Sequence, residues 1–342
     1  YNGGVSPATP SKFIFLGRLT RDTIINAQGQ ILVDQPGGNL LYAASGAALY
    51  DVYPQLVARV GIEYPQDWPA RFEQLGFGVA GLQLASTAID QRFFVYYPDV
   101  ERPIYDNPIR HFGDLSQALP KSLLGYQRPA PTLDSLKERN ALSLRPEDLP
   151  TDLAETRAAH LCGLDFLAHS TLTPVLRSAG IEQISLDAAT GYMHPQFWNE
   201  VPMLVNGLSA FLASERQVRT LFSGRAEALP AIAEQIANFN CGAVVIQRGR
   251  KGQHLFVREG ARHYQIPSYP ARAQDITGAG HAFGGGFAVG LQETGDPLEA
   301  ALYGGVAASV TVEGSGAFYA LEGSRGLAES RLEALRSAVR AL

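Results

Sequence analysis

The chain has 342 residues, of which 46% are hydrophobic and 18% are charged. This balance is typical of a folded globular protein and excludes disorder, a coiled coil or collagen as a description of the whole chain. The 28 Lys and Arg residues against 33 Asp and Glu residues give a net charge of −5, which argues against a dedicated nucleic-acid or membrane-surface binder. No apolar stretch approaches the roughly 18 residues that a membrane span needs.

The start of the chain and the cysteines bear on the compartment in which the protein works. The first residues lack the charged and then apolar pattern of a secretory signal peptide. The only two cysteines, Cys162 and Cys241, lie in apolar runs. We therefore expect buried free thiols in a reducing compartment, not a disulfide or a metal site. These features favour the cytoplasm.

Short apolar runs alternate with helix-length segments along most of the chain. Strands are predicted at 13–17, 55–61, 158–164, 181–187 and 243–247. Several of them are apolar at consecutive positions, which is typical of strands covered on both faces. Helices are predicted at 39–50, 66–76, 169–180, 209–221 and 226–240. Two or three more are predicted after residue 278. This alternation indicates a single α/β domain over 1–342 with a mainly parallel sheet and helices on both faces.

The region 88–115 breaks the alternation. Residues 87–97 and 104–112 mix charged and aromatic side chains and are predicted as the arms of a β-hairpin, whereas 113–150 is loop-like and holds five prolines. Together with strands predicted within 18–36, the hairpin would form a small β lid that projects from the main layer. A surface hairpin without a function is the alternative.

The segment 275–291 is the most informative part of the sequence. Apolar side chains recur every four residues from Ala279 to Leu291, as on one ridge of an α-helix, yet the segment holds six glycines. Each interior glycine costs a helix about 0.5–1 kcal/mol, so we expect a backbone that approaches something closely. Thr277 would cap the helix, and the amides of residues 278–280 would form an anion site at its positive end. Tight helix–sheet packing is the alternative explanation.

The order of residues at the start of this segment resembles the second signature of the ribokinase-like, or PfkB, family of carbohydrate kinases. The match consists of Asp275, Thr277, Gly278, Ala279 and Gly280. The resemblance implies a three-layer α/β/α sandwich with a β lid, ATP as the phosphate donor and Mg²⁺ as its metal. It also implies that Gly278, Ala279 and Gly280 stabilise the transferred phosphate, and that Asp275 and Thr277 contact the nucleotide, with a metal role for Asp275.

His281 departs from the family signature, which places its catalytic-base Asp at this position. The resemblance therefore implies that the side chain of His281 is the proton acceptor. A histidine beside ATP phosphates favours its protonated form, which cannot accept a proton. Replacing His281 with Asp is accordingly expected to raise turnover.

The N-terminal part of the chain is similar to the family's first signature, a glycine pair followed by a helix of small residues. Gly37, Gly38 and Asn39 carry this likeness, which implies that they hold substrate hydroxyls. Asp22 follows the first predicted strand, where the family has an Asp that accepts hydrogen bonds from two such hydroxyls. A carboxylate offers only acceptors, which suits a vicinal diol. Asn39 as a helix cap and Asp22 as an ordinary turn residue are the alternatives.

Two segments are similar to the nucleotide-binding parts of the family. Gly249 and Gly252 follow the predicted strand 243–247, where the family's nucleotide contacts begin. Gly314 and Gly316 lie in a segment similar to the one that lines the adenine pocket.

The family's magnesium organiser, the Glu of an Asn-x-x-Glu motif, has no clear counterpart. The best alignment places Ser214 at the Asn position and Gln217 at the Glu position. Glu215 would point about 200° around the helix from Gln217, so it does not substitute. Gln217 is therefore the expected, though altered, metal position.

These features predict an ATP-dependent kinase for a hydroxyl of a sugar, polyol or nucleoside, impaired at two positions of its site. The alternative is a catalytically silent protein of the same fold that binds sugar, nucleotide or a protein partner. A dinucleotide-dependent dehydrogenase is disfavoured because no G-x-G-x-x-G follows the first predicted strand. The resemblance also implies a homodimer formed through the lid.

Overall fold

The computed structural model describes residues 12–225 and 228–342. The first residues of the chain, which lack a signal-peptide pattern, and the first two residues of the predicted helix 226–240 lie outside the described part. The main sheet has ten strands in the order β13-β12-β11-β10-β9-β8-β7-β1-β4-β5. Its parallel strands are β1 Phe13–Leu16, β4 Gln55–Val60, β5 Gly78–Leu84, β7 Ala158–Leu161, β8 Gln183–Asp187, β9 Ala210–Ser214 and β10 Ala243–Gln247. Its antiparallel edge consists of β11 Gln253–Val257, β12 Arg262–Ile266 and β13 Arg340–Ala341.

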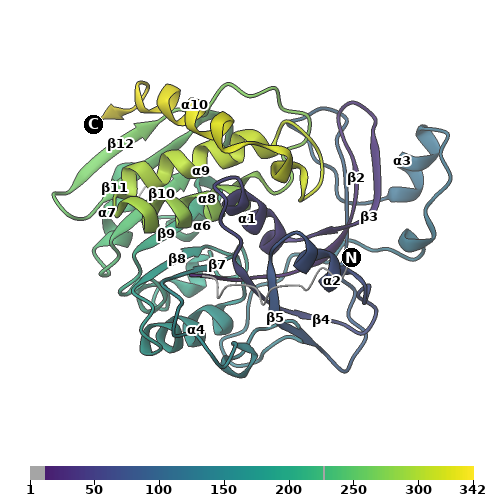
Figure 1. Ribbon diagram of the computed structural model, residues 1–342, viewed down its shortest axis with the longest axis horizontal. Coiled ribbons are helices and arrows are strands. Elements are labelled where there is room, and N and C mark those ends of the chain that lie inside the picture. The colour runs from purple at the N-terminus through teal and green to yellow at the C-terminus, as the bar shows by residue number, and fades with distance from the viewer. Residues whose placement is uncertain (1–11, 226–227) are drawn as a thin grey trace, which may run out of the picture.

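Helices cover both faces of this sheet (Figure 1). One face carries α1 Asn39–Ala48, α2 Trp68–Gln74, α8 Ala279–Thr294, α9 Pro297–Thr311 and α10 Arg325–Arg336. The other face carries α4 Phe166–Ser178, α5 Val201–Val205, α6 Glu215–Leu221 and α7 Leu229–Ala237. Short 3₁₀ turns occupy Lys121–Leu123, Pro146–Asp148, Pro195–Phe197, Gly249–Lys251 and Tyr319–Glu322.

The strand sequences are apolar at consecutive positions because each strand feeds two cores. In β1, Phe15 packs into the core beneath α1 and α8, whereas Ile14 and Leu16 pack into the core beneath α4, and all three are fully buried. The predicted parallel sheet with helices on both faces is therefore confirmed. Cys162 and Cys241 are buried free thiols, as predicted.

Two predicted elements are wrong. The predicted helix 209–221 is strand β9 followed by the short helix α6, because residues 210–213 are buried between β8 and β10. Periodicity does not distinguish so short an apolar run from a helical turn. The predicted hairpin arm 104–112 contributes one bridge, between Ile104 and Tyr96, and then becomes helix α3 Pro108–Asp114, with its proline in the first turn.

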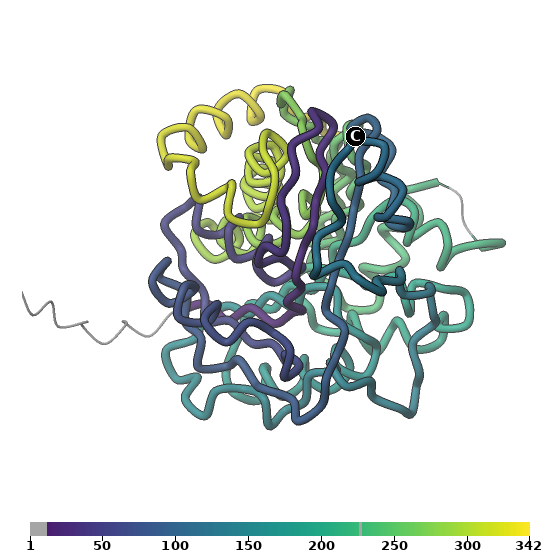
Figure 2. The backbone as a smooth tube through the Cα atoms, turned by 90° about the vertical axis from the view of Figure 1, so that its right-hand side faces the viewer, coloured from purple at the N-terminus to yellow at the C-terminus, as the bar shows by residue number. Residues whose placement is uncertain are grey.

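A separate three-stranded sheet, hereafter the lid, is built from β2 Thr20–Ile25, β3 Ile31–Gly37 and β6 Arg92–Tyr96. The strand β2 lies in the middle, antiparallel to β3 and parallel to β6. Figure 2 shows the purple hairpin of β2 and β3 beside the blue chain that carries β6. Strands therefore occur in both regions from which a lid was expected.

The glycines inside α8 allow close packing of helices. A Cβ on Gly285 would lie 1.8 Å from the carbonyl oxygen of Ala43 in α1, and one on Gly286 would lie 2.9 Å from that of Tyr303 in α9. A Cβ on Gly284 would lie 2.5 Å from the ring of His160 in the sheet strand β7. Close packing against helices and against the sheet thus explains these interior glycines. Among the helices of residues 12–225 and 228–342, none is both long and apolar enough to cross a bilayer.

Candidate active site

The first turn of α8 lies over the carboxyl ends of neighbouring parallel strands. Gln247, the last residue of β10, approaches the Gly280 carbonyl through its side-chain amide at 3.4 Å. Asp187, the last residue of β8, hydrogen-bonds to His281. Ligands of open α/β sheets bind at this edge. The start of α8 is therefore held where a ligand would meet it.

The cap of α8 differs from the sequence prediction. Gly278 is the N-cap, with φ of 76°, and no side chain caps the helix. Thr277 is therefore not the cap; its hydroxyl hydrogen-bonds to the Tyr97 hydroxyl at 2.8 Å, which joins the end of the lid strand β6 to this turn. The Ala279 amide donates to Ile276 at 3.3 Å, whereas the amides of Gly278 and Gly280 donate to no acceptor in the described part of the chain. Two of the three predicted amides are thus available to an anion at the positive helix end.

His281 forms a close pair with Asp187. The distance from His281 Nδ1 to Asp187 Oδ2 is 3.0 Å, and the side chains are 39% and 9% exposed, respectively. The ring of His160, on β7, is the other titratable group near His281 in the sheet. Burial lowers the pKa of His160 to about 3, with the charge of His281 as a smaller cause. His160 is therefore neutral, and Asp187 is the charged partner of His281.

The predicted substrate carboxylate, Asp22, lies in the lid strand β2 and is only 2% exposed. Its carboxyl group sits directly against Gly37, where a Cβ would come within 2.0 Å of Oδ2, and it accepts hydrogen bonds from the Gly38 amide and from Thr20 Oγ1, the latter at 2.5 Å. Burial raises the pKa of Asp22 to about 7; the bond from Thr20 opposes the shift and the charge of Asp275 adds to it. Asp22 is therefore not an ordinary turn residue.

Tyr42 connects the Asp22 side of the site with the start of α8. Its ring fills the space beside Gly278, where a Cβ would lie 2.0 Å from the ring. Its hydroxyl is buried and lies close enough to Asp22 and Asp275 for both to raise its pKa, although burial is the larger cause. Burial likewise raises the pKa of Asp275, whose Oδ1 accepts from the Thr277 amide at 2.8 Å. In the described part of the chain, neither the Tyr42 hydroxyl nor Asp275 Oδ2 has a hydrogen-bond partner.

Asn39 does not cap α1, and its side chain has two partners within the fold. Its Oδ1 accepts from the Arg18 amide at 2.7 Å, and its Nδ2 donates to the Gly163 carbonyl at 2.8 Å. The helix cap is Gly38, not Asn39. Asn39 therefore links the segment that follows β1 to the segment that follows β7.

The predicted nucleotide glycines fall into two kinds. Gly249 has φ of 56° and open space where a Cβ would stand, so a ligand has access to it. The other three predicted nucleotide positions have tight surroundings or a turn role. Gly252 is packed against the Ile266 carbonyl, Gly314 against the ring of Tyr319, and Gly316 has φ of 86° in the turn after α9. Gly249 is thus the predicted position that remains open to a nucleotide.

The side chain of Gln217, the predicted metal position, forms hydrogen bonds within the fold. Gln217 Oε1 accepts from the amide of Ser214 at 2.7 Å and from its hydroxyl at 2.9 Å, and Nε2 donates to Ala188 at 2.9 Å. Ser214 and Gln217 thus form the capping box of α6. No group of three His, Cys, Asp or Glu side chains suited to a metal occurs in the described residues. These residues do not fit a magnesium ion held by the protein, and Gln217 does not replace the family's Glu.

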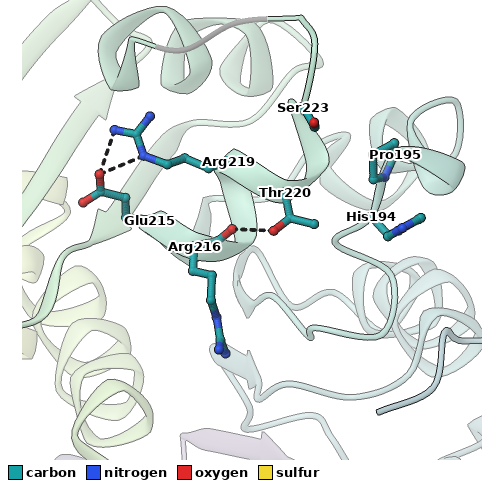
Figure 3. Close-up of a pocket in the computed structure, with 7 residues that line it drawn as sticks. All are labelled: His194, Pro195, Glu215, Arg216, Arg219, Thr220 and Ser223. Atoms are coloured by element: carbon teal, nitrogen blue, oxygen red, sulfur yellow. Dashed lines mark hydrogen bonds and ion pairs between the residues drawn. The ribbon is translucent and has the colours of Figure 1, made fainter. Parts of the chain in front are cut away.

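A hollow of about 680 Å³ runs along α6 and is separate from the predicted site. It is lined by His194, Pro195, Glu215, Arg216, Arg219, Thr220 and Ser223 (Figure 3). Glu215 pairs with Arg219 at 2.7 Å and with Arg248 at 3.1 Å, and Arg216 points away from the first of these pairs. The hollow contains none of the predicted site residues, and its carboxylate is already neutralised.

Comparison with known proteins gives a family match in the C-terminal part of the chain. Residues 189–322 match the family model described as pfkB family carbohydrate kinase. A cytidine kinase of Thermococcus kodakarensis is 23% identical over 292 residues, which are 84% of this chain and 90% of that protein. The resemblance predicted from the glycine motif is therefore confirmed by the family model, which includes that motif.

Solved structures give the same fold. The nucleoside kinase of Burkholderia thailandensis in complex with inosine has a TM-score of 0.66 at 16% identity, covering 95% of this chain and 99% of that chain. A putative ribokinase II from E. coli in complex with ATP and Mg²⁺ has a TM-score of 0.68 at 16% identity, with the same coverage. The predicted ribokinase-like sandwich is thus confirmed for this chain.

The sequence missed Asp187, Tyr42 and Tyr97 as members of the site. Asp187 ends a predicted buried strand, and a carboxylate at the carboxyl end of a parallel strand is a recognisable pattern. The two tyrosines gave no comparable pattern, because an aromatic residue in an apolar helix or a lid strand is ordinary core sequence.

Proposed function

We propose that this protein transfers the γ-phosphoryl group of ATP to a hydroxyl of a sugar, polyol or nucleoside. The observation that carries the proposal is the junction made by Tyr42. On one side of its ring lies Gly278, with two available amides at the start of α8, and near its hydroxyl lie the buried carboxyl groups of Asp22 and Asp275. An anion site and a hydroxyl-accepting site therefore adjoin each other.

The residues of this junction match the needs of the reaction. Asp22 would accept hydrogen bonds from hydroxyls of the acceptor, as a carboxylate can do for a diol. The Gly278 and Gly280 amides would stabilise charge on the transferred phosphoryl group. His281 would take the proton of the attacking hydroxyl. Thr277 directly precedes Gly278, and Gly249 follows Gln247, whose side chain approaches the Gly280 carbonyl, so both would contact the nucleotide.

The relatives support the range of acceptors. One is named as a cytidine kinase, and another was solved with inosine, both of which have a ribose diol. We infer that ATP arrives with Mg²⁺ bound to its own phosphates, because the described residues do not hold the ion. Two buried thiols, Cys162 and Cys241, support the cytoplasm as the compartment. The edge strand β3 of the lid supports a homodimer through the lid.

A catalytically silent binding protein is the second candidate, and one observation favours it. The side chain of Gln217 is fully engaged in the cap of α6, so the family's metal organiser is missing. In this case ATP and the acceptor would bind in the same places without transfer.

A single assay separates the two candidates. The purified protein is incubated with ATP and Mg²⁺ and a panel of cytidine, inosine, ribose, fructose and myo-inositol. ADP release and the mass of the phosphorylated product are measured, and binding is followed by calorimetry. The kinase proposal expects a phosphorylated product with at least one acceptor, at the ordinary kinase rate of about 1–100 per second. Binding of ATP and an acceptor without product supports the silent candidate and refutes the kinase.

A further inference from the structure

His281 and Asp187 form a histidine–carboxylate pair at the start of α8. We propose that Asp187 is the positioning residue of this pair, holding the imidazole of His281 so that its Nε2 accepts the proton of the attacking hydroxyl. This inference rests on the proposed kinase function and specifies how its base works.

The geometry fixes which nitrogen carries the proton. Asp187 is the last residue of β8 and pairs with Leu212 of β9, one residue after Leu186 pairs with Leu161 of β7. Its Oδ2 lies 3.0 Å from His281 Nδ1. A carboxylate only accepts hydrogen bonds, so in the neutral imidazole Nδ1 is the donor and the lone pair lies on Nε2. In the described part of the chain no hydrogen-bond partner is found for Nε2, and the His281 side chain is 39% exposed.

The surroundings leave Asp187 as the only charged partner of His281 among the described groups. His160 on β7 faces the ring but stays neutral in its buried position, where Ser185 binds its Nδ1 at 2.9 Å. Gln247, at the end of β10, and Tyr97, from the lid, are uncharged neighbours of this turn. The groups that face Asp187 itself, Cys162 and Tyr192, are buried, and burial raises the pKa of both. They are therefore neutral as well.

The step balances with the groups named. The acceptor oxygen forms a bond to the γ-phosphorus as the bond from that phosphorus to the β,γ-bridging oxygen breaks, and ADP leaves. The acceptor proton passes to Nε2 of His281. The imidazolium that forms is stabilised by Asp187, the role that the carboxylate has in a Ser-His-Asp triad. Water then removes the proton from Nε2.

The experiment compares Asp187→Asn and His281→Ala with the wild type over a range of pH. Glu234→Gln is the matched control, because Glu234 pairs with His263 at 2.8 Å in another histidine–carboxylate pair outside the site. His281→Ala is expected to lower kcat about 10²-fold to 10⁴-fold while ATP still binds. Asp187→Asn is expected to lower kcat by about 10-fold or more and to move the acid limb of the kcat profile to lower pH, because the imidazolium loses its counter-charge. The control should leave kcat and the limb unchanged.

If Asp187→Asn does not fold, a measurement on the wild type still tests the proposal. Nitrogen NMR of labelled histidine should show His281 with its proton on Nδ1 and a lone pair on Nε2. The opposite tautomer overturns the inference. So does an Asp187→Asn variant that keeps both kcat and the acid limb, and in that case the kinase function still stands. A wild type that binds ATP and acceptors but forms no product overturns both.

Discussion

The raised pKa of the buried Asp22 carboxyl group predicts that this group lowers the free energy of unfolding as the pH rises. Its pKa is 3.8 when unperturbed and about 7 in the folded protein, chiefly because it is buried. Between these two values the folded protein holds a proton that the unfolded chain has released. The free energy of unfolding is therefore highest below about pH 4 as far as this group is concerned, and falls as pH rises through about 7.

The size of the effect follows from the shift. Each pH unit well inside this window costs about 1.4 kcal/mol, so the step from pH 5 to pH 8 removes about 2–3 kcal/mol from the wild type, and a further rise in pH removes little more. Asp22→Asn has no charge to bury and escapes this loss. Relative to the wild type, the variant should thus gain about 2–3 kcal/mol between pH 5 and pH 8. The same variant should lose affinity for the acceptor, since the ionised carboxylate is the better hydrogen-bond acceptor.

The assay is urea unfolding of both proteins at pH 5 and pH 8, with calorimetry of acceptor binding at pH 8. Taking the difference between the two pH values removes the cost of the unsatisfied amide group in the variant. Asp114→Asn, a change of a carboxylate that is 67% exposed on the lid helix α3, is the control. If Asp22→Asn gains no stability on going from pH 5 to pH 8, Asp22 does not bury its charge in the way described.

Three further changes test the junction between the lid and α8. Tyr97→Phe removes the hydroxyl that binds Thr277 at 2.8 Å, so it should cost about 1 kcal/mol in urea unfolding and raise KM for the acceptor; an unchanged KM would mean that the lid does not depend on this bond. Gly278→Ala places a Cβ 2.0 Å from the ring of Tyr42, at a residue with φ of 76°. The left-handed backbone conformation alone should lower the free energy of unfolding by about 1–2 kcal/mol in the same assay. An unchanged stability would contradict the packing. Gln217→Glu keeps the cap of α6 but loses its amide donor, so it should cost about 1 kcal/mol and leave the Mg²⁺ dependence of ATP binding unchanged, and a marked new dependence would argue for a metal position there.

Much of the fold was predictable because buried strands have a simple sequence pattern. The runs at 13–17, 55–61 and 243–247 are apolar on consecutive residues since both faces of the sheet are covered, and each is a strand. The same pattern misled the prediction at 209–221. There a buried strand runs directly into a helix, so two elements share one apolar stretch. The boundary is marked only by Ser214, which caps the helix.

The candidate site was predictable to the extent that its residues lie in local motifs. The glycines of the first turn of α8 are local, and so is the pair Gly37 and Gly38, of which Gly37 admits the Asp22 carboxyl group because it has no side chain. The pair of His281 and Asp187 joins positions 94 residues apart, and no local pattern specifies it. Its formation depends on the order of strands, which places the end of β8 beneath the start of α8.

That long-range pair changes the outcome expected for His281→Asp. From the sequence, an aspartate at 281 should raise turnover because it restores the family's base. In the structure, the new carboxylate would face Asp187, whose Oδ2 lies 3.0 Å from the present ring nitrogen. Two carboxylates so close cannot both ionise readily, so one keeps its proton and is a poor base.

We therefore expect His281→Asp to be slower than the wild type, and the double change with Asp187→Asn to be faster than His281→Asp alone, because the amide removes the opposing charge. The kcat values of the wild type, both single variants and the double variant test this coupling. A His281→Asp enzyme that exceeds the wild type would show that Asp187 places no such constraint on position 281. The histidine would then be an impaired base, and not half of a working pair.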